Sequence, residues 1–475
     1  MKKLMFVCLI FISFAFIGLF AESSFSLSTE EDRNSISVTI YNGGMGLVRE
    51  TRKLTLPKGV KLLRYEDVAS QILPQTVRIK SEDSQKLKIF EQNYEYDLIS
   101  HERLMDKYIG KEVTIYREHG EKEGQPTKAT LISNNGSPVY KIGNEISLGY
   151  FGRVTVPTLP DNLFAKPTLV WKLKNDEEKE QTLEVSYQTH GMNWSADYIL
   201  TLDKEESLSS LNSWVTLTNT SGTRFTNATL QLVAGKVQLL TNRQPEYAPI
   251  TKSARYSKEM ESMSDVAPEF QQENLSEYYL YTLDQPTTIG YNQTKQVQLF
   301  QTDNVNIKKY FVFENLPMYE GNEKKFNNAT VKYIFKNDKK SNLGRPLPSG
   351  TVRVFKADSK GRQQLLGEDT IDHTPENEDV KIKTGQAFDV VANGKRMSYE
   401  EYRLSSGFKA SYMAEIRNRK KEDIEVRFYA SLYGDWNISK SSHKFSKESS
   451  TRAFADVAIK AGETVKIEYT VDTKY

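Results

Sequence analysis

Alternating apolar and polar positions run through most of this 475-residue chain, and the clearest alternation lies within residues 183–235. Apolar residues fill every second position over 183–187, and after His190-Gly191 they resume on the opposite parity over 192–202. A period of two places one set of side chains on one face of a β-strand. A change of parity across a glycine is typical of a turn or a bulge, so the pattern predicts two strands that meet at Gly191.

Two further strands are expected nearby, over 214–218 and 227–233, with the Asn-Thr-Ser-Gly turn of residues 219–222 between them. Trp194, Tyr198 and Trp214 are the large side chains of these strands, and we expect them to fill the space between two facing sheets. Their chemistry is typical of a protein core and not of an active site.

Five short motifs stand out in this region and downstream of it. They are His-Gly-Met-Asn-Trp-Ser-Ala-Asp-Tyr at 190–198, Leu-Gly-Arg-Pro-Leu-Pro-Ser-Gly at 343–350, Gly-Glu-Asp at 367–369, Asp-His-Thr-Pro at 372–375 and Ala-Phe-Asp-Val at 387–390. With these motifs, and with the stretches 215–219 and 230–235, the chain resembles a bacterial domain-of-unknown-function family that also forms the C-terminal part of mucoidy-inhibitor-A-type proteins. The resemblance extends over residues 167–475 and, more weakly, over the N-terminal part.

This resemblance implies no particular reaction, because the family has no assigned activity. The likeness to mucoidy-inhibitor-A-type proteins implies a part in exopolysaccharide or envelope homeostasis. The chain departs from that type because it lacks the long charged heptad segment that would form a coiled coil. The motifs therefore indicate family membership and say little about activity.

Residues 1–21 have the features of a secretory signal peptide, with two lysines, an apolar run over 4–19 and cleavage expected after Ala21. The alternative is an uncleaved membrane anchor, because the apolar run approaches the ~18 residues that a spanning helix needs. No basic stop-transfer flank follows, which favours cleavage. Cys8, the only cysteine, lies in this run. The mature chain is therefore expected to have no disulfide, thiolate nucleophile or cysteine metal site.

The charge of the mature chain is balanced. The full sequence has 64 basic and 62 acidic residues. Cleavage of the leader takes away Lys2 and Lys3 but no acidic residue. This balance disfavours a nucleic-acid-binding protein, which needs a concentrated basic face, and also a polybasic membrane-surface protein. The expected partner is an envelope protein or a polysaccharide, and the membrane is contacted only through the leader, if that is not cleaved.

The N-terminal part is predicted to be a small β-domain over residues 22–96. Strands at 35–41 and 46–56 are joined by Asn42-Gly43-Gly44, which is a strong hairpin signal. Further short strands follow within the same range. This part of the chain therefore has the alternation of a half-buried sheet.

A short helix and a small barrel are predicted over residues 97–160. The helix is expected over 101–109, with Ser100 as its N-cap and Gly110 just after its end. Five short strands in quick succession follow over 112–156, and such spacing favours a compact SH3-like barrel. Barrels of this kind often bind partners, but the fold alone implies no function.

After a proline-rich linker, the rest of the chain is predicted to be a C-terminal module of immunoglobulin-like β-sandwiches, with its first part at 167–240 and the remainder at 277–475. Short strands with regular turns and no helix–strand alternation predict sandwiches and not a parallel α/β sheet. Residues 241–276 lose this periodicity and contain three prolines, so we expect a flexible surface excursion there. The predicted fold class is all-β and multidomain.

Catalytic residues are hard to identify in this pattern. The five histidines form no His-x-His or His-x-x-x-His pair, which disfavours a zinc site. His190 is the best catalytic candidate, because it lies near Asp197 and a serine could join the two in space. The alternative is a turn histidine whose ring bonds local backbone. We favour that alternative, because no Gly-x-Ser-x-Gly elbow accompanies it.

Three other groups each have a chemical and a structural interpretation. Residues 441–444 match Ser-x-x-Lys but lie in a strand-and-turn region and not at a helix start. The acidic residues within 369–379 could bind calcium weakly, but their spacing is not that of a calcium loop. Tyr278, Tyr279 and Tyr281 could stack on sugars, or they could pack the core and cover its edges.

We therefore expect no catalytic, cofactor-binding or metal-binding residues. The expected function is that of an exported, non-enzymatic β-sandwich protein of the bacterial cell envelope, acting in binding or scaffolding. One alternative is a carbohydrate-binding or sugar-processing protein in which Tyr279 contacts the glycan. A second is a hydrolase that uses His190 and Asp197. The expected location is the periplasm, the cell surface or the extracellular medium.

Overall fold

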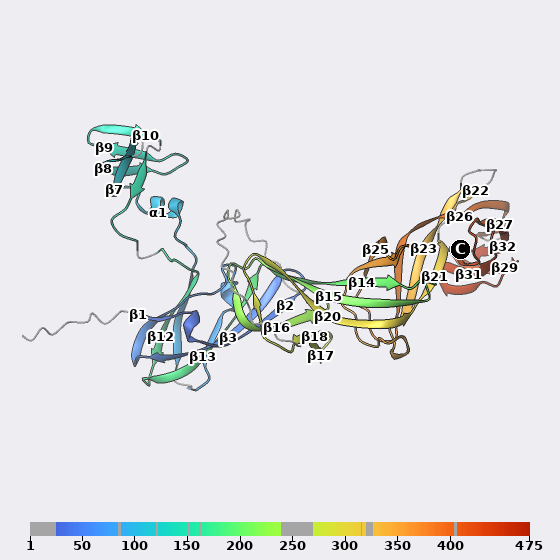
Figure 1. The fold of residues 1–475 in the computed structure, drawn as a ribbon, viewed down its shortest axis with the longest axis horizontal. Coiled ribbons are helices and arrows are strands. Elements are labelled where there is room, and N and C mark those ends of the chain that lie inside the picture. Colours follow the sequence, from blue (N-terminus) through green and yellow to red (C-terminus); the bar gives the residue numbers. More distant parts are fainter. Residues whose placement is uncertain are drawn as a thin grey trace, which may run out of the picture. The chain divides into compact units, whose positions relative to one another are not determined.

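The computed structural model of the protein describes residues 25–83, 87–119, 122–149, 152–160, 163–238, 269–314, 316–319, 326–402 and 406–475. The structure is 67% strand and 4% helical and contains several sheets (Figure 1), so the all-β, multidomain class is confirmed. The signal peptide predicted for 1–21 lies outside the described residues, as do residues 241–268 of the predicted surface excursion.

The chain folds into two compact units, and neither is one continuous segment. The first holds the described residues up to Ser35 together with Arg49–Tyr187, and the second holds Ile36–Val48 together with Gln188–Tyr475. This division differs from the predicted start of the C-terminal module at residue 167. The reason is that strand β12 (Thr168–Asn175) pairs with two strands of the first unit, a long-range pairing that local sequence does not reveal.

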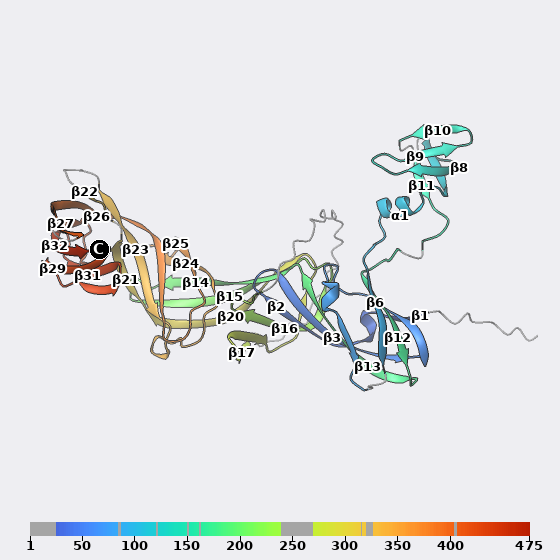
Figure 2. The same ribbon diagram turned by 180° about the vertical axis from the view of Figure 1, so that it is seen from behind.

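Two sheets form the sandwich of the first unit, and their strands come from widely separated parts of the sequence (Figure 2). One sheet has the order β1 (Phe25–Ser28), β4 (Gly59–Tyr65), β12, β6 (Lys88–Glu95). The other includes, in this order, β3 (Met45–Leu56), β13 (Lys179–His190) and β5 (Arg78–Ser81). Buried rings of Tyr65, Trp171 and Tyr187, from β4, β12 and β13, fill the core of this sandwich.

A helix and a five-stranded sheet follow within the first unit. Helix α1 (His101–Lys107) begins as predicted, because the Ser100 side chain accepts a hydrogen bond from the Arg103 N–H at 3.1 Å, but it ends two residues early. Met105 and Tyr108 pack against the sheet. Its strand order is β10 (Glu145–Leu148), β9 (Val139–Ile142), β8 (Lys122–Ser133), β7 (Glu112–His119), β11 (Arg153–Thr155). The five predicted strands are confirmed, but the described residues include no pairing that closes them into a barrel.

The predicted hairpin at Asn42-Gly43-Gly44 is confirmed, and both glycines have positive φ. It joins β2 (Arg33–Tyr41) to β3, and β2 pairs in parallel with β16 (Phe225–Ala234). β16 pairs with β18 (Tyr278–Leu283), and β18 with the edge strand β17 (Phe270–Leu275). The end of the predicted excursion at 241–276 is therefore a strand. Its Gln-Gln-Glu-Asn sequence is exposed and has no apolar period, so the prediction missed it.

A five-stranded sheet contains the most strongly alternating part of the sequence. Its order is β20 (Gln293–Asn306), β15 (Leu208–Asn219), β14 (Met192–Leu202), β24 (Gly350–Ala357), β25 (Gln363–Ile371). Gly191, with a φ of 81°, separates β13 from β14, and these two strands belong to different sheets. The predicted change of parity thus marks a switch between sheets. Trp194 and Tyr198 are buried, as predicted. Trp214 is only half-buried, so its predicted place in the core is wrong, because it lies on the face of β15 opposite to that of the buried Val215 and Leu217.

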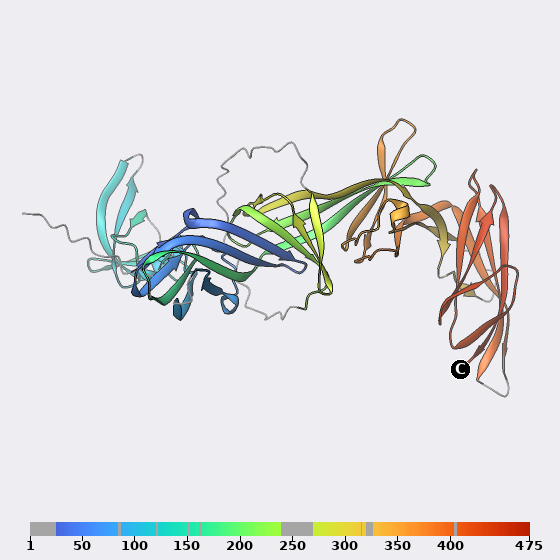
Figure 3. The ribbon, with the colours of Figure 1, turned by 90° about the horizontal axis from the view of Figure 1, so that it is seen from below.

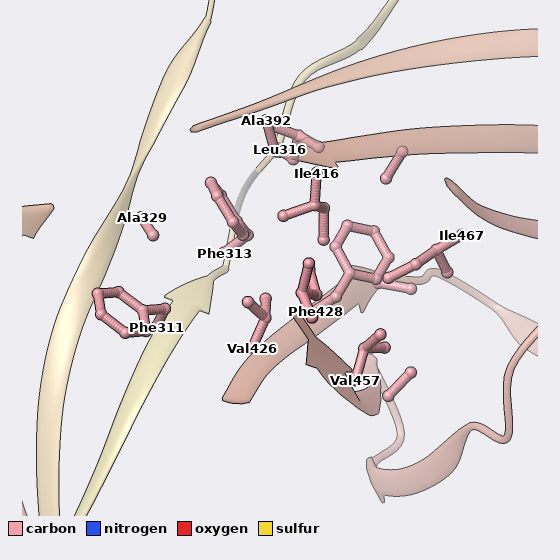
Figure 4. Packing of buried hydrophobic residues seen from close by; sticks show 14 of the residues in the cluster. Phe311, Phe313, Leu316, Ala329, Ala392, Ile416, Val426, Phe428, Val457 and Ile467 are labelled. Atoms are coloured by element: carbon pink, nitrogen blue, oxygen red, sulfur yellow. The ribbon is translucent and has the colours of Figure 1, made fainter. Parts of the chain in front are cut away.

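The largest sheet folds around its own core. Its order is β29 (Asp435–Ser441), β32 (Thr464–Lys474), β27 (Gly407–Asn418), β26 (Asp379–Glu401), β23 (Asn327–Lys336), β21 (Lys308–Phe313), β28 (Ile424–Ser431), β31 (Arg452–Ile459), β30 (Ser446–Ser449), with β22 (Met318–Tyr319) on β26. Figure 4 shows Ile416 and Ile467 from one side of this order meeting Phe313 and Phe428 from the other. The two ends of the sheet thus share one core, as in a sandwich.

Four asparagines at or next to strand ends are almost wholly buried, with at most 1% of their surface exposed. They are Asn175, Asn219, Asn337 and Asn418. Each side-chain amide donates to two or three main-chain oxygens. For Asn418 the acceptors are Glu422, Ile459 and Lys460, at 2.8–3.2 Å. Buried carbonyl groups need donors, and these amides supply them where the strand ladder ends.

A network of charged groups is buried in the first unit. Arg52 and Glu50 on β3 are wholly buried and are joined by an ion pair of 2.9 Å, and Arg33 bonds the other oxygen of Glu50 at 2.7 Å. The Arg52 guanidinium also lies 3.5 Å from the centre of the Tyr65 ring, which links β3 to β4 across the sandwich. A buried carboxylate of this kind is stable only while its cationic partners remain.

We expect Arg52→Ala to lower the free energy of unfolding of the first unit by about 3–5 kcal/mol, because it removes one of the two cations that compensate the buried Glu50. Arg49→Ala on the same strand is the control. Arg49 is 60% exposed in its ion pair with Glu184, so its loss should cost about 1 kcal/mol or less. Urea denaturation measures both values, and equal losses would contradict this role of the buried network.

Candidate functional site

The Leu-Gly-Arg-Pro-Leu-Pro-Ser-Gly motif at residues 343–350 forms a loop that leads into β24. Buried side chains donate to three of its main-chain oxygens: Asn337 to Arg345 at 2.7 Å, Tyr281 to Pro346 at 3.0 Å, and Tyr198 to Pro348 at 2.7 Å. Prolines lack an N–H, so this loop cannot pair with a neighbouring strand through a regular ladder of main-chain hydrogen bonds. Its main-chain oxygens are instead bonded by side chains from other parts of the chain, and these bonds determine its conformation.

Two glycines let the loop approach its neighbours. Gly344 has a φ of 77°, and a Cβ there would lie 2.7 Å from the side chain of Lys339. A Cβ at Gly350 would lie 2.1 Å from the main-chain oxygen of Ala196 on β14, the parallel partner of β24. A larger residue at Gly350 would therefore separate the two strands. Folding requirements alone account for both glycines of this motif.

A hollow of about 200 Å³ lies beside this loop. Its lining residues are Phe270, Gln272, Tyr281, Leu299, Phe300, Gly344, Arg345 and Pro346. Two of the strands that line it, β17 and β20, are edge strands of their sheets. Arg345 is exposed, and its guanidinium lies 4.8 Å from the centre of the Phe300 ring. The hollow thus combines ring surface with one exposed cation, which suits a ligand that has an apolar and an anionic part.

His373, from the Asp-His-Thr-Pro motif, contacts Ser349 at the end of this loop. The Ser349 N–H donates to Nδ1 at 3.1 Å, and the Ser349 Oγ lies 3.3 Å from Nε2. Because Nδ1 accepts a hydrogen bond, the neutral ring carries its proton on Nε2 and donates it toward Oγ. A general base must instead accept the proton of the hydroxyl group. This tautomer therefore cannot activate Ser349 as a nucleophile.

The electrostatic surroundings of His373 also differ from those of a catalytic histidine. Burial lowers the pKa of His373 from its ordinary value, and the charge of Asp372 only partly opposes this effect. Within the described residues, no carboxylate hydrogen-bonds the ring. The histidine is therefore neutral near pH 7 and lacks the orienting acid of a catalytic triad. Its position indicates a structural role in fixing the loop.

The other predicted pair, His190 and Asp197, does not come together. His190 ends β13, whereas Asp197 lies within β14, and the extended chain between Met192 and Asp197 spans about 16 Å. Asp197 accepts hydrogen bonds from Thr216 at 2.6 Å and from Arg353 at 3.1 Å. Catalysis requires hydrogen-bond reach between base and nucleophile. The pair therefore lacks the geometry of a hydrolase.

The remaining polar candidates are engaged in local structure. Ser442 and His443 bond each other at 2.9 Å on an exposed turn that follows β29. In the acidic region 369–379, Asp369 accepts hydrogen bonds from the main-chain N–H groups of Thr370 and Lys383. In the part of the chain that the structure describes, no group of three or more His, Cys, Asp or Glu side chains could hold a metal ion.

The tyrosine run on β18 does not form an exposed sugar platform. Tyr281 is buried and holds the loop. Tyr278 packs closely on Gly235, and a Cβ added to Gly235 would lie 2.5 Å from the Tyr278 ring. Tyr279 is half-buried. This arrangement agrees with the core-and-edge interpretation of the run.

Sequence reasoning missed Asn337, Arg345 and Phe300. Asn337 directly follows a strand, Asn175 and Asn418 end theirs, and all three precede a charged turn, so this recurrence was a usable signal. Arg345 lay inside a recognised motif but had no stated role. No local pattern places Arg345 beside Phe300, because β20 and the loop meet only in the folded chain.

No protein-family model matches the chain, and no curated protein matches it significantly. The family resemblance of the motifs therefore stays a prediction. Among the described residues, no helix has the length and apolar character needed to cross a membrane.

We expect His373→Asn to make the protein less sensitive to acid. The pKa of the folded-state ring lies below the ordinary value of 6.5, so the unfolded chain binds a proton more readily than the folded chain. The stability that the neutral ring supplies is present above about pH 6.5 and is lost as the pH falls toward the folded-state pKa. Urea denaturation between pH 7 and 5.5 should therefore show a larger loss for the wild type. Equal losses would contradict this account.

Proposed function

We propose that the protein is an exported, non-enzymatic binding component of the bacterial cell envelope, and that it holds a partner protein at the hollow beside Arg345. The main support is the contrast between this hollow and the groups around it. The hollow presents ring surface and an exposed guanidinium. The imidazole of His373 and the carboxylate of Asp197 are instead engaged with main chain, hydroxyl or cation partners.

The size and charge of the hollow suggest what it takes. A volume of about 200 Å³ is smaller than the ~300–1,000 Å³ of small-molecule pockets, so it suits one protruding side chain. Arginine and aromatic residues supply much of the energy of protein interfaces. Contact with Phe300 also limits the conformations that Arg345 must lose on binding. We therefore propose that an acidic side chain of the partner inserts there.

The envelope assignment depends on the predicted leader and on the resemblance to the C-terminal part of mucoidy-inhibitor-A-type proteins. Both suggest export and a role near the cell surface. Glycan binding is the second candidate function, and the exposed rings of Tyr399 and Tyr475 favour it.

A photo-crosslinking residue at Gln272, which lines the hollow, should give a discrete crosslinked partner in living cells. The same residue at Glu273 is the control, because successive side chains of a strand point to opposite faces. Arg345→Ala should reduce the Gln272 crosslink about tenfold or more, which corresponds to a loss of about 1.4 kcal/mol or more of binding energy.

The proposal fails if Gln272 gives no crosslink, or if Arg345→Ala leaves the crosslink unchanged. It also fails if position 273 captures the same partner equally well. Thermal unfolding of each variant shows that a lost crosslink does not reflect a lost fold.

A further inference from the structure

One end of the last sheet exposes a row of aromatic rings, which we call the ring platform: Tyr399, Phe408 and Tyr475. Tyr399 lies on β26, Phe408 on β27 and Tyr475 directly after β32, and these strands are neighbours in the sheet. The ring centres of Tyr399 and Phe408 are 5.1 Å apart, and those of Phe408 and Tyr475 are 6.3 Å apart. One ring on, or directly after, each of three adjacent strands therefore forms a row across the strand direction.

The ring platform continues the core-facing side of the sheet. Tyr399 is paired with Ala410, which is wholly buried, and the same face carries Tyr412, stacked at 5.3 Å on the buried ring of Tyr469. Beyond Tyr412 the rings reach solvent, and Tyr399 is 44% and Tyr475 75% exposed. Figure 3 shows the C-terminus at one end of these orange and red strands.

The backbone packs closely around Tyr475. Gly434 has a φ of 68° and lies against Tyr475. A Cβ added to Gly434 would lie 3.2 Å from the Tyr475 ring and 2.5 Å from the main-chain oxygen of Lys474. The Tyr475 N–H donates to the main-chain oxygen of Ser406 at 3.1 Å. The backbone beside the exposed ring is therefore fixed. An exposed group of rings on a fixed backbone indicates a binding surface.

Two opposite charges flank the Tyr399 ring of the platform. The Arg396 guanidinium lies 4.8 Å from the centre of the Tyr399 ring, and the Tyr399 hydroxyl donates to Glu401 at 3.3 Å. One cation and one anion thus flank the same ring. The charges of this pair cancel, and both groups can hydrogen-bond hydroxyls.

We infer that the ring platform binds an uncharged, linear polysaccharide whose sugar rings stack on Tyr399 and Tyr475. A pyranose ring has an apolar face for such stacking and hydroxyl groups at its edge for Glu401 and Arg396. A row of rings across three strands suits an extended chain of sugars better than a single compact ligand. This inference deepens the proposed binding function and adds a second site distinct from the hollow.

Affinity electrophoresis of the full chain through gels containing neutral β-glucans, with soluble cellohexaose as competitor, tests the inference. The wild type should be retarded, and Tyr399→Ala and Tyr475→Ala should each weaken binding about tenfold, because each removes one stacking surface. Tyr399→Phe keeps the ring and should retain most of the binding. A galacturonic-acid polymer should retard the protein less than the neutral glucans.

Phe388→Ala is the matched control, because Phe388 lies on the same strand and is 89% exposed but does not belong to the ring platform. Its binding should equal that of the wild type. The inference is overturned if no neutral glucan retards the wild type, if the acidic polymer binds more tightly, or if Phe388→Ala loses as much as Tyr399→Ala. The Gln272 crosslink should persist in Tyr399→Ala, so failure at one site can be told from failure at the other.

Discussion

Buried carbonyl groups at the ends of strands need hydrogen-bond donors, and in this protein asparagine side chains supply them. Asn175, Asn219, Asn337 and Asn418 each lie where a strand ladder stops, and each amide binds two or three oxygens of a turn and its neighbours. A buried acceptor left without a donor costs about 1–3 kcal/mol. The turns around these amides therefore have one favourable conformation, and the strands that follow start in a defined register.

The candidate site depends on the same interaction. Asn337 binds the oxygens of Arg345, Thr374 and Pro375, and so ties the 343–350 loop to the segment that carries His373. Tyr198 and Tyr281 add donors from two other strands. The position of Arg345 over Phe300 thus follows from buried hydrogen bonds, and the polar side chains of Asn337, Tyr198 and Tyr281 hold the loop in place.

Local patterns in the sequence predicted the parts of this structure that local interactions determine. The hairpin at residues 42–44, the capping of α1 by Ser100 and the change of parity at Gly191 are all found in the structure. Pairings between distant segments were not predictable in this way. Strand β12 joins the first unit because it pairs with β4 and β6, and β17 is a strand because β18 pairs with it. The hollow is likewise a product of such pairings.

The most direct test of this account is hydrogen exchange of Asn337→Ala measured by mass spectrometry, with Asn193→Ala, an exposed asparagine on β14, as the control. If the buried amide holds the loop, exchange should become faster over 343–350 and 372–375 in Asn337→Ala and stay unchanged in the control. Unchanged protection of both segments in Asn337→Ala would contradict the account.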